Sequence, residues 1–152
     1  MKLVLASDHA GFQLRETLAD YARTLGHDVI TVGAPTEEAY DYPDAADEGV
    51  EKFMKEHADF AVFVCGSGIG ICMRANKHHG IRAADCTSVE MAKLARQHNH
   101  ANVLCLGQRI TEPDMAKEIM EAFLNEAPDT TERHQRRVDK INGNVTAPRQ
   151  LS

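Results

Sequence analysis

An apolar run that breaks into closely spaced glycines constrains the fold of this chain most strongly. Residues 60–64, Phe-Ala-Val-Phe-Val, have the length and the β-branched and aromatic content of a buried strand. Cys65-Gly66-Ser67-Gly68-Ile69-Gly70 follows, and residues 71–77 have a helical pattern. Such a turn exposes backbone N–H groups that can bind anions and developing oxyanions. The segment predicts either a small-anion site carrying a thiol and a hydroxyl, or a tight turn with an inert, buried Cys65.

The glycine spacing does not match two better-known phosphate-binding motifs. No Gly-Lys-Ser/Thr follows, as a P-loop would require. A dinucleotide fingerprint belongs after the first strand, whereas Gly66, Gly68 and Gly70 come after the third expected strand.

Strand and helix patterns alternate along the chain. Strands are expected at residues 2–6, 28–32, 60–64, 81–84 and 103–106, and helices at 11–25, 43–55, 71–77, 87–97, 111–125 and 132–141. A capping box with Thr87 or Ser88 at the cap is expected to open the fourth helix. The alternation predicts an α/β protein with a doubly wound, Rossmann-like, three-layer fold around a five-stranded parallel sheet. Residues 1–142 form a single expected domain, and the Pro-, Gly- and polar-containing tail at 143–152 is expected to be mobile.

Composition narrows the classes of function. The net charge of −6 over 152 residues disfavours nonspecific nucleic-acid binding. No apolar run approaches the length of a membrane span, and the apolar start is too short for a signal peptide. The cysteine spacing fits neither a disulfide framework nor a zinc site, so a reducing, cytoplasmic compartment is expected. The four cysteines are Cys65, Cys72, Cys86 and Cys105.

Ligands of doubly wound folds bind outside the carboxyl ends of the strands. After the first strand, Asp8 and His9 offer proton transfer or hydroxyl and phosphate binding, although Asp8 alone would more commonly cap a helix. Arg109 follows the fifth strand. Tyr42 precedes a proline that opens a helix. Its hydroxyl either reaches the same carboxyl edge of the sheet as a binding group, or its side chain simply packs there.

Basic residues cluster in two other places. Arg133 and Arg137 are spaced i, i+4, so a helix would put both guanidinium groups on one face, suited to phosphate or simply solvated. His98 follows the predicted helix at 87–97, where it is either a titrating acid or base or a solvated histidine near the helix dipole. Adjacent His78 and His79 lack the spacing of a metal site, and no metal or other cofactor is expected.

In their order and spacing, these residues resemble the ribose-5-phosphate isomerase B family of the ribose/galactose isomerase superfamily. The resemblance extends to about residue 141. Its motifs are Ser7-Asp8-His9-Ala10-Gly11-Phe12, Asp41-Tyr42-Pro43, Cys65-Gly66-Ser67-Gly68-Ile69-Gly70, Ala75-Asn76-Lys77, Gly80-Ile81-Arg82-Ala83, Arg96-Gln97-His98-Asn99 and Arg133-His134-Gln135 followed by Arg137-Val138.

The resemblance implies metal-independent interconversion of ribose 5-phosphate and ribulose 5-phosphate through an enediolate. It assigns Cys65 as the base between C1 and C2, and Ser67 as its helper. The backbone N–H groups from Gly66 through Gly70, with Gly68 and Ile69 between them, would hold the enediolate oxygens. Ile71 stands where another branch carries glutamate, which places this chain in the cysteine-base branch.

The remaining roles also come from the resemblance. His98 would help to open the furanose ring, and Asp8 and Asn99 would contact the sugar. The phosphate would be held by His9, Arg109, Arg133 and Arg137. The family forms homodimers or homotetramers whose active sites are shared between subunits.

Two alternatives remain open at the sequence level. One is an isomerase of a six-carbon sugar phosphate, such as allose 6-phosphate or galactose 6-phosphate, because sugar preference depends on pocket depth. The other is a noncatalytic sugar-phosphate sensor on the same fold. A sensor would need the arginines but not the thiol.

Overall fold

The computed structural model describes residues 1–143, so the predicted mobile tail from 144 onward lies outside the described residues. Strands and helices alternate as expected through residue 125, and a last helix follows. The strands are β1 (Lys2–Ser7), β2 (Asp28–Gly33), β3 (Phe60–Cys65), β4 (Ala83–Asp85) and β5 (Val103–Gly107). The helices are α1 (Phe12–Thr24), α2 (Tyr42–Lys55), α3 (Ile69–Ala75), α4 (Val89–Asn99), α5 (Pro113–Asn125) and α6 (Glu132–Asn142).

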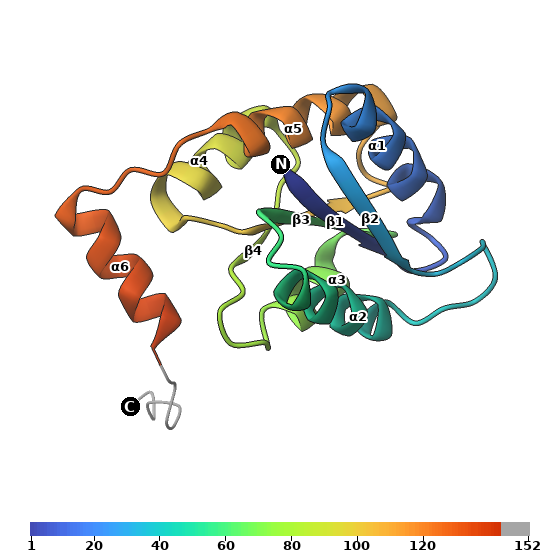
Figure 1. The fold of residues 1–152 in the computed structure, drawn as a ribbon, viewed down its shortest axis with the longest axis horizontal. Helices are drawn as coiled ribbons and strands as arrows, with labels where there is room; N and C mark the ends of the chain where they lie inside the picture. Colours follow the sequence, from blue (N-terminus) through green and yellow to red (C-terminus); the bar gives the residue numbers. More distant parts are fainter. Residues whose placement is uncertain (144–152) are drawn as a thin grey trace.

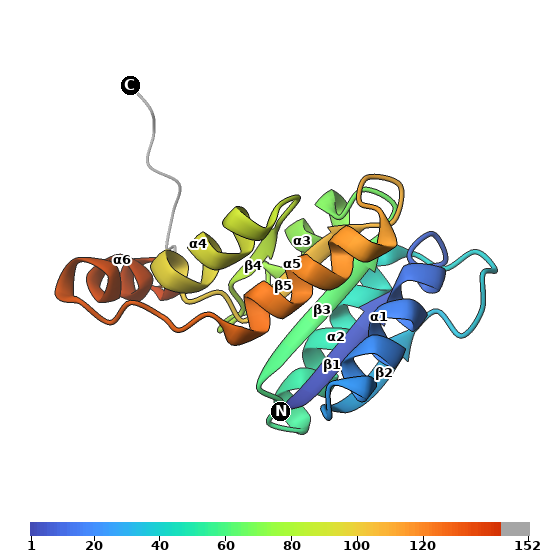
Figure 2. The same ribbon diagram turned by 90° about the horizontal axis from the view of Figure 1, so that it is seen from above.

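All five strands are parallel and lie in the order β2-β1-β3-β5-β4. This arrangement confirms the predicted doubly wound fold. Helices α1, α4 and α5 cover one face of the sheet, and α2 and α3 cover the other (Figure 1). Seen from above, α6 extends beyond α4, away from the sheet (Figure 2).

The core consists of two apolar layers, one on each face of the sheet. Alternate residues of each central strand point to opposite faces, so β3 places Val62 and Val64 under α1 and α5, and Phe63 and Cys65 under α2 and α3. The register pairs Ser7 with Val64, and Cys65 with Gly107. The carboxyl ends of β1, β3 and β5 therefore meet at one edge of the sheet.

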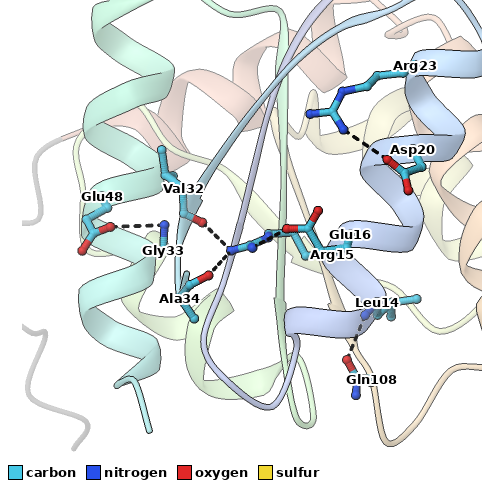
Figure 3. A network of polar contacts seen from close by, with 10 residues as sticks. All are labelled: Leu14, Arg15, Glu16, Asp20, Arg23, Val32, Gly33, Ala34, Glu48 and Gln108. Atoms are coloured by element: carbon cyan, nitrogen blue, oxygen red, sulfur yellow. Dashed lines mark hydrogen bonds and ion pairs between the residues drawn. The ribbon is translucent and has the colours of Figure 1, made fainter. Parts of the chain in front are cut away.

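A buried arginine fastens α1 to the end of β2. Arg15 Nη1 donates to the carbonyl oxygens of Val32 and Ala34 at 2.9 and 2.8 Å, as Figure 3 shows. Leu14 N–H, one residue earlier, donates to Gln108 Oε1 from the segment after β5. These contacts hold the loops at the carboxyl edge against the first turn of α1, close to the predicted site.

Several predicted boundaries were wrong by two residues, at β4, α3, α4 and the start of α5. Strand β4 begins at Ala83 rather than residue 81, because the Arg82 N–H donates to the Asn102 side chain instead of joining the strand ladder. Helix α3 begins at Ile69, two residues earlier than expected. Ser88, not Thr87, caps α4 and accepts the Met91 N–H at 3.1 Å, which puts Glu90 one position too early to complete a capping box.

Candidate active site

A cavity of about 550 Å³ opens at the carboxyl edge of the sheet. It gathers most of the residues predicted after β1 and β3, together with Arg109 after β5 and Tyr42 from the first turn of α2. Gly68 lies in the same loop and shapes the turn. The lining residues are Asp8, His9, Ala10, Tyr42, Cys65, Gly66, Ser67, Ile69, Gly70, Met73, Arg109 and Ile110.

The thiol of Cys65 forms part of the cavity wall at the end of β3. Only 3% of this residue is exposed, and the Gly68 N–H donates to its sulfur at 3.2 Å. Gly68 has φ +82°, a left-handed conformation that a residue with a side chain adopts only with strain. The loop therefore holds the Cys65 sulfur at the cavity wall, next to a backbone donor.

The hydroxyl of Ser67 faces the same loop backbone. Its Oγ accepts the Ile69 N–H at 3.2 Å, across the start of α3. The hydroxyl hydrogen is left free to contact a bound oxygen. A thiol and a hydroxyl thus stand two residues apart on the wall of one cavity, as required for proton transfer next to oxygen.

Asp8 both supports the backbone and lines the cavity. Its Oδ1 accepts the Gly11 N–H at 2.9 Å, just before α1 begins, and only 5% of the residue is exposed. Burial raises the pKa of Asp8, although the Gly11 hydrogen bond and the charges of His9 and Arg109 oppose the rise. Gly11, not Asp8, is the N-cap of α1, so the expectation that Asp8 caps the helix is wrong: its carboxyl holds the loop before the helix and lines the cavity.

Two cationic or potentially cationic side chains complete the cavity. His9 Nδ1 lies 3.0 Å from both the backbone nitrogen and the carbonyl oxygen of Tyr40, so the segment before α2 holds the imidazole ring in place. The backbone N–H of Arg109 donates to the Gly66 carbonyl at 3.0 Å. The Arg109 guanidinium lies so close to Gly66 that a Cβ there would come 3.0 Å from Nη1. The cavity can accordingly hold an anion beside the glycine loop.

Besides Gly68, four predicted site residues do not line this cavity in the single chain. His98 and Asn99 end α4 at the opposite edge of the sheet, where the Asn99 carbonyl accepts from Arg82 Nε at 3.2 Å. Arg133 and Arg137 lie on α6, which extends away from the sheet (Figure 1). His98 stacks on His134, which belongs to α6 like the two arginines. The four predicted residues outside the cavity therefore form a second group around α4 and α6.

The sequence did not single out Met73 and Ile110, which stand at the cavity with 64% and 60% of their surfaces exposed. Met73 is four residues beyond Ile69, and helical spacing could have placed it beside the loop. Ile110 follows Arg109 in the turn after β5 and carries no sequence signal of its own.

Among residues 1–143, no helix is both long enough and apolar enough to cross a membrane. The same residues contain no group of three or more His, Cys, Asp or Glu side chains placed to hold a metal ion. Within that range all four cysteines are free thiols.

A doubly wound sheet that carries a thiol, a carboxyl and a glycine-rich loop around a cavity at its carboxyl edge is typical of α/β enzymes that act on small molecules. A sequence model described as Ribose/Galactose Isomerase matches residues 3–141. The chain belongs to the ribose/galactose isomerase family.

Individual relatives agree with this assignment. Ribose-5-phosphate isomerase B of Escherichia coli is 37% identical over 140 residues, covering 92% of this chain and 93% of that protein. D-erythrulose-4-phosphate isomerase of Pectobacterium atrosepticum is 36% identical over 126 residues, covering 82% and 83%. The structure of Clostridium thermocellum ribose-5-phosphate isomerase B superposes with a TM-score of 0.90 at 39% identity, covering 93% of this chain and 95% of that one.

Proposed function

We propose that this chain interconverts ribose 5-phosphate and ribulose 5-phosphate. The placement of Cys65 carries the proposal: its thiol lines the cavity of a ribose/galactose isomerase fold and accepts a hydrogen bond from the glycine loop. An aldose–ketose isomerase needs a base close to carbon and donors for the enediolate oxygens. The loop supplies both within six residues.

In the proposed reaction, the Cys65 thiolate removes the proton from C2 of the open-chain aldose. The electron pair moves between C2 and C1, and the carbonyl oxygen at C1 takes up the developing charge. Backbone N–H groups from Gly66 to Gly70 and the Ser67 hydroxyl stabilise the enediolate. A proton also passes from the C2 hydroxyl to the C1 oxygen by way of the Ser67 hydroxyl. Return of the proton from Cys65 to C1 then gives the ketose, with no metal or other cofactor in the step.

The remaining roles are divided between the two groups of residues. Asp8 holds sugar hydroxyls, while His9 and Arg109 hold the phosphate at the cavity, with Tyr42 at its rim. His98 opens the furanose ring, Asn99 contacts the sugar, and Arg133 and Arg137 complete the phosphate site. Since the second group lies around α4 and α6, we propose that a second copy supplies it in a homodimer, alone or paired into a tetramer.

The length of the sugar is part of the proposal. A relative named for a four-carbon sugar phosphate shows that the family spans more than one chain length. We propose ribose 5-phosphate as the preferred substrate over allose 6-phosphate, and a cytoplasmic location in keeping with four free thiols among residues 1–143.

Turnover by the purified protein tests the proposal. Ribose 5-phosphate, erythrulose 4-phosphate and allose 6-phosphate would be compared in the presence of a chelator. Rapid, chelator-insensitive conversion of ribose 5-phosphate is expected. Preference for another sugar phosphate would correct the substrate, and loss of activity with the chelator would refute metal independence. Saturable binding of ribose 5-phosphate without turnover of any of the three would instead establish a sensor.

A further inference from the structure

A carboxyl group lies against the loop that presents Cys65. Asp85 ends β4, next to Cys105 of β5 in the parallel register. Its Oδ1 is buried and has no hydrogen-bond partner among residues 1–143. A Cβ built on Gly68 would come within 2.5 Å of this oxygen and 3.0 Å of the carboxyl carbon. The Asp85 side chain therefore packs directly on the backbone of Gly68.

Gly68 connects this carboxyl to the thiol. Its N–H donates to Cys65 Sγ at 3.2 Å, while its Cα faces the Asp85 carboxyl. We propose that Asp85 is a positioning residue that acts through Gly68 to set the pH range in which Cys65 serves as the base. The proposal rests on the role assigned to Cys65 above. It adds a residue outside the cavity lining, Asp85, that controls Cys65.

The surroundings of Asp85 contain thiols rather than cations. The thiols near Asp85 are those of Cys72 on α3, Cys86 just after β4, and Cys105 on β5. The charge of Asp85 opposes the ionisation of each of them. Burial raises the pKa of Asp85, and no cation among residues 1–143 offsets the rise. On the side of Cys65, the charged or titratable groups along the cavity are Asp8, His9, Tyr42 and Arg109.

Electrostatics give the direction of the effect. A carboxylate under Gly68 and a thiolate on Cys65 are two negative charges in a region of low dielectric, so ionisation of one disfavours ionisation of the other. The proposal therefore predicts that a neutral side chain at position 85 makes formation of the Cys65 thiolate easier.

Alkylation of Cys65 with iodoacetamide across a pH series tests the inference without any substrate. The extent of reaction at Cys65 would be measured by mass spectrometry of its peptide, which separates it from the other three cysteines. The variants are Asp85→Asn, which keeps the shape of the side chain, and Asp85→Val, which removes its polarity. Asp28→Asn, an exposed carboxyl on the edge strand β2, serves as the matched control.

We expect the midpoint of Cys65 alkylation to move down by about half a pH unit or more in both Asp85 variants, and to stay unchanged in the control. The acid limb of kcat/KM against pH should move in the same direction. A folded Asp85 variant, checked by circular dichroism, that keeps the wild-type midpoint would overturn the proposal, whatever its turnover number. If neither wild type nor variant turns over sugar phosphate and the midpoint still shifts, the function assigned to Cys65 fails while its control by Asp85 stands.

Discussion

The imidazole rings of His98 and His134 stack in parallel, with centroids 4.6 Å apart and planes 8° from each other. His98 belongs to the last turn of α4, and His134 is a buried residue of α6. His134 Nε2 also lies 3.5 Å from Asp129 Oδ2, in the segment that joins α5 to α6. The stack thus attaches α6, with Arg133 and Arg137, to the body of the protein.

This attachment should weaken as the pH falls. Burial lowers the pKa of His134 below 6.5, outweighing the opposite effect of Asp129. As the pH falls, His134 therefore takes up a proton in the unfolded chain before it does so in the folded protein. The contribution of His134 to the free energy of unfolding is complete above pH 6.5 and is lost progressively below it. Thermal unfolding midpoints should drop less between pH 7.5 and 5.5 in His134→Gln than in wild type. His79→Gln, at an exposed histidine, provides the control; equal slopes in His134→Gln and wild type would contradict the prediction.

Replacement of Cys65 by alanine should remove nearly all isomerase activity. The substitution deletes the proposed base, a change that costs about two to four orders of magnitude in kcat. Phosphate binding, measured by competition with inorganic phosphate, should be largely retained because the cationic groups remain. Cys86→Ala removes a buried thiol that does not line the cavity and should keep near-normal turnover. Activity of Cys65→Ala within tenfold of wild type would refute the assignment.

The close approach of Gly70 and Tyr42 predicts a local steric effect. A Cβ on Gly70 would lie 2.7 Å from Cε2 and Cζ of the Tyr42 ring, so Gly70→Ala must displace the ring or the loop. We expect KM for ribose 5-phosphate to rise by about tenfold, a loss typical of disturbed substrate positioning. In a Tyr42→Ala background the added methyl group has room. The double variant should therefore be no worse than Tyr42→Ala alone, and a fully additive loss would show that the contact is irrelevant.

Sharing of the active site between copies can be tested by complementation. A chain with Cys65→Ala and a chain with both Arg133→Ala and Arg137→Ala should each be inactive. Co-expressed in equal amounts, they should regain about a quarter of wild-type activity, since half of the dimers are mixed and each mixed dimer keeps one intact site.

A second pairing distinguishes this sharing from simple stabilisation of one chain by the other. Cys65→Ala with Asp8→Asn places both defects in the same cavity. No mixed dimer then contains an intact site, and activity should not return. Recovery in this pair, or its absence in the first pair, would contradict a shared site.

The order of elements could be predicted from sequence because its signals are local. The run at 60–64 carries enough β-branched and aromatic residues to specify a buried strand, and the structure confirms it as the first five residues of β3. The start of β4 was wrong because the side chain of Asn102, far along the chain, captures the Arg82 N–H. Boundaries fixed by such distant partners leave no local pattern.

The cavity residues followed from a rule about parallel sheets, which places strand ends together whatever the side chains. The separation of His98 and Arg137 from Cys65 could not be foreseen, because their spacing along the chain says nothing about which edge of the sheet they reach. Asp85 was missed for another reason. It belongs to no motif, and only the packing of β4 under Gly68 reveals its position. The roles assigned to these residues stay predictions.

The strand order has a consequence for the chain during its synthesis. Cys65 pairs with Gly107, so the wall behind its thiol cannot close until β5 has left the ribosome. Synthesis proceeds from the N-terminus, and β1 to β3 emerge with this edge of the sheet still open. The thiol that the proposed reaction uses therefore acquires its complete surroundings only after most of the chain has been made.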